Sequence, residues 1–142
     1  MPEVSFYILP SQSQQERQAF ACKLIEKVYR SGHYCYVLSD SEQQSQQLDD
    51  QLWTFRPGSF VPHQRHQGQL PAIRRTILIG GDPVPEQWRE VVVNLSATPP
   101  QQSEHCGRIL EILDNSEATK QVGRNRYRYY REAGLDITTH QM

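Results

Sequence analysis

Residues 4–39, VSFYILPSQSQQERQAFACKLIEKVYRSGHYCYVLS, place a helical pattern between two apolar segments. The first segment, 4–9, is rich in β-branched and aromatic residues and is stopped by a proline, which predicts a strand. Ser13 and Glu16 have the spacing of a capping box, and apolar residues then recur at helical spacing up to a glycine. The second segment, 33–39, predicts a buried strand. A strand, a helix and a strand in this order predict a parallel, right-handed β-α-β unit.

Working outward, a Gln-rich helix is expected after this unit, with its apolar side chains near its C-terminal end. Residues 55–75 carry prolines and glycines among Gln, His and Arg and predict a long irregular loop. A last helix is expected to end near Ala133, before Gly134. Three more apolar runs predict strands at 76–79, 91–95 and 109–113. The sum is a single α/β domain over residues 1–142, with a five-strand, mostly parallel sheet flanked by helices.

The composition of the chain limits the kinds of protein that it can be. The chain has 142 residues, with 15 Lys plus Arg against 16 Asp plus Glu and a net charge of −1. This balance argues against a protein that covers nucleic acid or an anionic membrane with its whole surface. No apolar run approaches the roughly 18 residues of a membrane span, and no signal peptide is apparent. Three cysteines without paired spacing do not predict a disulfide framework. We therefore expect a soluble cytoplasmic protein.

Several catalytic and cofactor motifs are absent or incomplete. Gly80-Gly81 follows a predicted strand, but Pro83 and Pro85 stand where a helix would receive a phosphate, so a plain turn is the better interpretation. His63 and His66 lie among prolines, without a neighbouring Cys or carboxylate to complete a metal site. A Gly-x-Ser-x-Gly motif is missing. We expect no enzyme, no metal and no cofactor.

The strongest indication of a binding site in the sequence is the segment 120–131, which contains five basic residues and no acidic residue. The rest of the chain keeps 10 basic and 16 acidic residues, a net charge of −6. Four of the basic residues follow helical spacing along one stripe: Lys120, Arg124, Arg128 and Arg131. A solvated helix face is one interpretation. The other is a site for an anionic ligand with an apolar part, either an acidic peptide ending in a carboxylate or single-stranded nucleic acid stacking on tyrosine.

A second group of residues is aromatic and surrounds the start of the predicted loop. It contains Trp53, Phe55, Phe60, Val61 and Pro62. Aromatic residues at a helix end often fold back onto the core. Alternatively they form an anchor for a protein partner, because Trp and Phe dominate interface hot spots.

These residues resemble the chi subunit of bacterial DNA polymerase III over nearly the whole chain. The aromatic block and the terminal basic helix, in this order and spacing, are the most specific part of the resemblance. The matching segments are FYIL at 6–9, RSG at 30–32, LDDQLW at 48–53, SFVPH at 59–63 and KQVGRNRYRYYREAG at 120–134. The resemblance implies a Rossmann-like, three-layer fold without a nucleotide-binding loop.

The resemblance also implies a non-catalytic accessory subunit of the clamp-loader assembly in DNA replication, with two partners. One is the psi subunit, bound as a 1:1 heterodimer and linking chi to the clamp loader. The other is the acidic, Phe-ending C-terminal tail of single-stranded-DNA-binding protein. Carried over by position, the psi interface would include Trp53, Phe60 and Pro62. The tail site would include Leu113, Lys120, Arg124, Tyr127 and Arg128. This sequence has Arg128 where the familiar form has Lys, and Leu113 where it has Val, so charge and apolarity are kept.

Membership of this family implies a bacterial, cytoplasmic protein at the nucleoid-associated replisome, in contact with DNA only indirectly and without contact to a membrane. Whether the aromatic surface also serves a repair helicase stays open. Two other functions remain to be tested against this one. The first is direct binding of single-stranded nucleic acid by the basic helix, and the second is a nucleotide-binding enzyme of Rossmann type.

Overall fold

The structure is a computed structural model that describes residues 2–54 and 61–142. The described residues form three α-helices: α1 (Gln14–Arg30), α2 (Glu42–Thr54) and α3 (Glu117–Glu132). They also form seven strands: β1 (Glu3–Ile8), β2 (Cys35–Leu38), β3 (His63–Arg65), β4 (Ile77–Gly80), β5 (Val91–Asn94), β6 (Arg108–Leu113) and β7 (Asp136–Gln141). Two short 3₁₀ helices, Glu86–Glu90 and Ser103–His105, precede β5 and β6.

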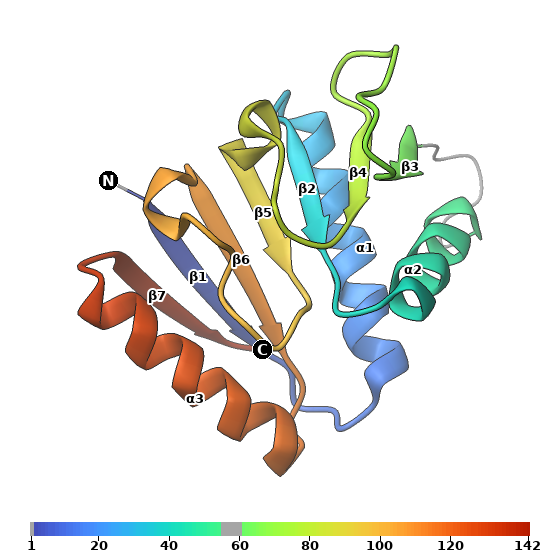
Figure 1. Ribbon diagram of the computed structural model, residues 1–142. Helices are drawn as coiled ribbons and strands as arrows, with labels where there is room; N and C mark the ends of the chain where they lie inside the picture. The colour runs from blue at the N-terminus through green and yellow to red at the C-terminus, as the bar shows by residue number, and fades with distance from the viewer. Residues whose placement is uncertain (1, 55–60) are drawn as a thin grey trace.

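The seven strands make one sheet in the order β3-β4-β2-β5-β6-β1-β7, and every neighbouring pair is parallel (Figure 1). The first strand of the chain therefore lies between two strands from its last third. Glu3 pairs with Arg108 of β6 on one side and with Asp136 of β7 on the other.

Helices cover both faces of the sheet, with α1 and α2 on one face and α3 on the other (Figure 1). The central strands are consequently buried on both faces and read as continuous apolar runs. In β5, for example, Val91 and Val93 pack in the cluster under α1 and α2, whereas Val92 packs in the cluster under α3. The predicted α/β architecture with a parallel sheet flanked by helices is confirmed.

The opening segment folds largely as its sequence pattern predicts. The Ser13 hydroxyl accepts a hydrogen bond from the backbone N–H of Glu16 at 3.2 Å and caps α1. Gly32, just after α1, has a φ of 87°, a value that a residue with a side chain rarely adopts. β1 and β2 are parallel members of the sheet but are separated in it by β5 and β6.

The prediction of five strands is wrong, because the described chain has seven. β3 lies inside the segment expected to be an irregular loop and pairs with β4, while β7 follows α3 and pairs with β1. Both strands are at the edges of the sheet and are mostly polar, His-Gln-Arg in β3 and Asp-Ile-Thr-Thr-His-Gln in β7. Since an edge strand buries little apolar surface, its sequence carries no apolar pattern from which it could be predicted.

The three cysteines are buried and free, in agreement with the absence of a disulfide framework in the sequence. Burial raises the pKa of the Cys22 and Cys35 thiols to about 12, and that of Cys106 to about 11. None of these thiols is therefore ionised near neutral pH. Within residues 2–54 and 61–142, no helix is both long enough and apolar enough to traverse a bilayer.

Candidate functional site

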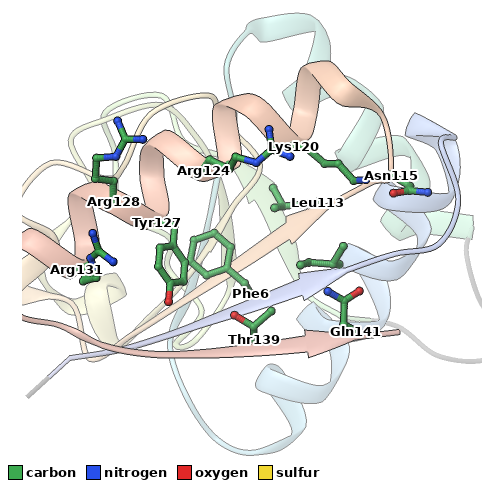
Figure 2. Close-up of a pocket in the computed structure, with 12 residues that line it drawn as sticks. Phe6, Leu113, Asn115, Lys120, Arg124, Tyr127, Arg128, Arg131, Thr139 and Gln141 are labelled. Carbon is green, nitrogen blue, oxygen red and sulfur yellow. The ribbon is translucent and has the colours of Figure 1, made fainter.

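A pocket of about 480 Å³ lies between α3 and the β6-β1-β7 part of the sheet (Figure 2). The three strands bring together residues from both ends of the chain, and α3 supplies one long wall. The residues that line the pocket are Phe6, Ile8, Leu113, Asn115, Lys120, Gly123, Arg124, Tyr127, Arg128, Arg131, Thr139 and Gln141.

The α3 wall carries the stripe of four basic residues predicted from the sequence. Arg124, Arg128 and Arg131 are exposed and Lys120 is half-buried. Within the described part of the chain, no carboxylate forms an ion pair with any of the four. Their charges are therefore not compensated locally, and the rim of the pocket attracts anions. The forked guanidinium groups suit bidentate binding of carboxylate or phosphate.

The inner surface of the pocket is apolar and aromatic. Phe6 of β1 is 2% exposed and Leu113 of β6 is 5% exposed, whereas Tyr127 of α3 is 39% exposed. The rings of Phe6 and Tyr127 have centroids 5.6 Å apart and an interplanar angle of 49°. The pocket thus combines an apolar seat for one ring or branched side chain with a cationic rim.

Gly123 allows α3 to approach β6 closely. A Cβ atom at this position would lie 2.6 Å from Cδ1 and 3.0 Å from Cδ2 of Leu113. A glycine inside a helix destabilises it by roughly 0.5–1 kcal/mol relative to alanine, so its presence here needs a packing reason. The close contact with Leu113 is that reason, and a larger residue would displace Leu113.

Arg126, the fifth basic residue of the segment, faces the opposite way and is buried. Its Nε lies 2.9 Å from Oε1 of Glu111, and the two side chains are 3% and 0% exposed. Arg126 is one of the five basic residues between Lys120 and Arg131, but its charge is paired with that of Glu111 inside the protein. The exposed basic group therefore consists of four side chains, not five.

Glu111 is the centre of a buried polar network that attaches α3 to the sheet. Its Oε2 accepts hydrogen bonds from the Tyr130 hydroxyl at 2.5 Å and from the Asn94 amide at 2.8 Å, while Arg126 also donates to the carbonyl of Ala97 at 3.2 Å. Burial raises the pKa of Glu111, and Arg126 together with these donors opposes that rise. With Arg126 and Tyr130 held inward, the stripe on the other side of α3 faces the pocket rim. We call this set, Asn94, Glu111, Arg126 and Tyr130, the Glu111 network.

A family model described as "DNA polymerase III chi subunit, HolC" matches residues 1–138. The chain belongs to the DNA polymerase III chi subunit family. The resemblance inferred from the sequence motifs is confirmed.

Three relatives named DNA polymerase III subunit chi are similar over nearly their full length. The protein from Pseudomonas aeruginosa is 31% identical over 142 residues, which is 100% of this chain and 98% of the relative. The Haemophilus influenzae protein is 29% identical over 94% of this chain and 93% of its own, and the Escherichia coli protein is 25% identical over 98% and 97%.

In this chi-family protein, all five residues predicted for the tail site line the same pocket: Leu113, Lys120, Arg124, Tyr127 and Arg128. The strands opposite α3 contribute four residues to the pocket that were not predicted to belong to the site: Phe6, Ile8, Thr139 and Gln141. Phe6 and Ile8 could have been identified, because alternate residues of a strand lie on one face. Thr139 and Gln141 could not be assigned to the site from the sequence, because their strand, β7, was not predicted.

Of the aromatic group predicted around the start of the loop, the structure describes Trp53, Val61 and Pro62. Trp53 at the end of α2 is 58% exposed, Pro62 is half-buried, and Val61 is fully buried in the core. Phe55 and Phe60 lie outside the described residues. The Trp53 ring packs against His63 of β3, with centroids 5.0 Å apart. β3 and β7 are the two outer strands of the sheet (Figure 1). Trp53 packs on β3 and the pocket includes residues of β7, so the two lie at opposite edges of the sheet.

Among residues 2–54 and 61–142, no three His, Cys, Asp or Glu side chains are grouped so that they could hold a metal ion. At the Gly80-Gly81 turn, the Tyr36 hydroxyl donates a hydrogen bond to the carbonyl of Gly81 at 2.7 Å. The same hydroxyl would lie 2.7 Å from a Cβ at Gly80. The small residues of this turn therefore make room for Tyr36, and a 3₁₀ helix rather than an α-helix follows.

Proposed function

We propose that this chain is a non-catalytic accessory subunit of the DNA polymerase III clamp-loader assembly, which connects the psi subunit to the acidic C-terminal tail of single-stranded-DNA-binding protein. Membership of the chi family supports a role in this polymerase. The observation that carries the tail assignment is the pocket, because an apolar seat inside a rim of four uncompensated cations suits a chain that is acidic and ends in phenylalanine.

The proposed binding mode follows from the chemistry of the two parts of the pocket. The terminal phenyl ring would pack against Phe6, Leu113 and Tyr127. The terminal carboxylate would pair with Lys120 and Arg124, and acidic residues earlier in the tail with Arg128. Exposed ion pairs contribute about 0.2–1 kcal/mol each, and salt screens them. Binding should therefore be in the micromolar range and should weaken as salt is added.

Replacement of Arg124 by alanine tests the tail assignment. Arg124→Ala should weaken binding of a synthetic tail peptide by up to about fivefold, because an exposed ion pair of up to about 1 kcal/mol to the terminal carboxylate is lost. Isothermal titration calorimetry measures the change. Arg108→Ala removes the same charge from the other end of β6 and should bind as the unmodified protein does. Equal affinities for the two variants would contradict the assignment.

Direct binding of single-stranded nucleic acid is the competing function for the same helix. One exposed aromatic ring, Tyr127, lines the pocket, so the site suits the end of a peptide better than a row of stacked bases. In the calorimetric experiment, an oligonucleotide titrated in place of the peptide should produce weak heat or none. Tight oligonucleotide binding that Arg124→Ala abolishes would support the competitor.

The psi subunit is proposed to bind at the other edge of the sheet, around Trp53 and Pro62, with Phe60 assigned only from the family resemblance. Trp53→Ala should weaken binding to psi by more than about tenfold, since exposed tryptophans are frequent hot spots of interfaces. Tail binding and thermal stability should not change. Tyr129→Ala, which removes another exposed aromatic ring from α3, is the matched control. A Trp53→Ala protein that keeps full affinity for psi would place the interface elsewhere.

The proposal includes a single Rossmann-like domain over residues 1–142, located at the bacterial replisome in the cytoplasm and touching DNA only through its partners. The third candidate, a nucleotide-binding enzyme, needs a phosphate loop. The space over Gly80 is occupied by Tyr36, and this contact supports a structural turn at that position.

A further inference from the structure

β7 is an edge strand with one unpaired side. Its six residues pair with β1, and within the described part of the chain no strand lies beyond it (Figure 1). Five of the six residues are exposed. An uncovered edge of this kind exposes a row of backbone N–H and C=O groups on which another extended chain can pair.

The hydrogen bonds to β1 show which residues of β7 expose these groups. The N–H of Asp136 donates to the carbonyl of Pro2 at 3.4 Å, and the N–H of Met142 donates to that of Ile8 at 3.0 Å. Because alternate residues of a strand direct their backbone groups to the same side, the even-numbered residues pair with β1. The N–H and C=O groups of Ile137, Thr139 and Gln141 therefore point away from β1, toward the unpaired side.

The side chains of β7 connect this edge with the pocket. Thr139 and Gln141 line the pocket and lie on the side of the sheet that faces α3 (Figure 2). His140 lies on the opposite face, where its ring stacks on Tyr7 with centroids 4.9 Å apart. Two of the three residues whose backbone groups point to the unpaired side, Thr139 and Gln141, thus also line the pocket with their side chains. A peptide that leaves the pocket past them passes along the edge of β7.

The charges near this edge suit an acidic chain. Arg128 and Arg131 of α3 also line the pocket, and among residues 2–54 and 61–142 neither forms an ion pair with a carboxylate. An acidic strand on β7 would lie next to these guanidinium groups. A second copy of this protein is a poorer occupant, because pairing two β7 edges would bring two basic rims together, and like charges repel.

We propose that the residues preceding the terminal phenylalanine of the acidic tail add to β7 as an extended strand, hydrogen-bonded to the backbone of Thr139 and its neighbours. This inference rests on the proposed function and specifies how that ligand is held. The backbone contacts would contribute affinity independent of the tail's side chains, and Arg128 and Arg131 would select acidic residues.

Proline at position 139 tests the inference. Thr139→Pro removes an N–H that points away from β1, so the β1–β7 ladder keeps its bonds, and proline is tolerated at this kind of edge position. Thr139→Ala removes the side chain and keeps the N–H. The alanine variant is the reference for the loss of the side chain, and we expect the proline variant to bind the tail peptide about five- to tenfold more weakly than the alanine variant, as for one or two lost hydrogen bonds. Equal affinities for the two variants would overturn the inference.

A second measurement uses the unmodified protein and so does not depend on how the proline variant folds. Tail peptides methylated at single backbone nitrogens are titrated in turn. We expect alternate positions to lose affinity and the intervening ones to keep it, because only every second N–H of an added strand faces β7. If the unmodified peptide binds and all methylated peptides bind equally, the strand inference alone fails. If the unmodified peptide does not bind, the proposed function fails as well.

Sedimentation of the protein without peptide completes the test. A monomer that stays monomeric at high concentration supports a vacant edge. A dimer that Thr139→Pro dissociates would assign the edge to a second copy and overturn the inference.

Discussion

Replacing Glu111 by alanine is expected to lower the free energy of unfolding by about 3–5 kcal/mol, because it leaves the charge of Arg126 buried without a partner. The hydroxyl of Tyr130 and the amide of Asn94 lose their acceptor at the same time. Since total stabilities are about 5–15 kcal/mol, this is a large fraction, and the melting temperature should fall by roughly 10–15 °C. Chemical denaturation followed by circular dichroism measures the loss.

Two further variants separate the ion pair from other effects. Glu104→Ala removes an exposed carboxylate and should change stability by less than about 0.5 kcal/mol. The double variant Glu111→Leu with Arg126→Met should lose less than the sum of the two single replacements, because neither charge is then left alone in the interior. If Glu111→Ala costs no more than Glu104→Ala, the Glu111 network does not stabilise the fold.

Reversing two charges of the rim, Arg124→Glu with Arg128→Glu, is expected to weaken tail binding more than about a hundredfold. Each replacement removes an attraction of up to about 1 kcal/mol and adds a repulsion of similar size, and tenfold in affinity corresponds to 1.4 kcal/mol. Both side chains are exposed, so the fold should persist. Co-purification from cell extract should show loss of single-stranded-DNA-binding protein and retention of psi, because Trp53 is at the other edge of the sheet.

A control variant with the same net charge as the Arg124→Glu, Arg128→Glu protein shows whether overall charge explains the result. Lys23→Glu with Arg108→Glu makes the same change in total charge at two exposed positions that do not line the pocket. This variant should retain both partners. Loss of tail binding in the control would mean that overall charge governs the interaction, and simultaneous loss of psi in the rim variant would mean that the two surfaces are not separate.

The sequence predicts the central part of the fold well for a physical reason. β2, β4, β5 and β6 are covered on both faces, so their sequences are apolar runs that are easily recognised, with Glu111 as the charged interruption in β6. β3 and β7 are held mainly by backbone pairing with a neighbouring strand. That pairing depends on tertiary contacts, and a single sequence does not reveal it.

Of the pocket, the sequence predicts the α3 wall but not the strand residues opposite it. Helical periodicity identifies the stripe from Lys120 to Arg131 because it reports which side chains share a face of one helix. It does not report which strands lie opposite, so Phe6 and Thr139 were missed. For Arg126 a signal was available, since the predicted fifth strand contains Glu111 between apolar neighbours, and a carboxylate in such a strand requires a buried basic partner.

The position of β1 between β6 and β7 also affects how the protein is made. During synthesis, residues 3–8 emerge about 100 residues or more before their partners, residues 108–113 and 136–141. Contacts between such distant segments form late and slowly, and β1 has both edges exposed until they form. The pocket contains Phe6 of β1 and Thr139 of β7, which are far apart in the sequence. A truncated or half-folded chain therefore lacks a finished pocket, so only subunits that have completed folding would be recruited by the tail.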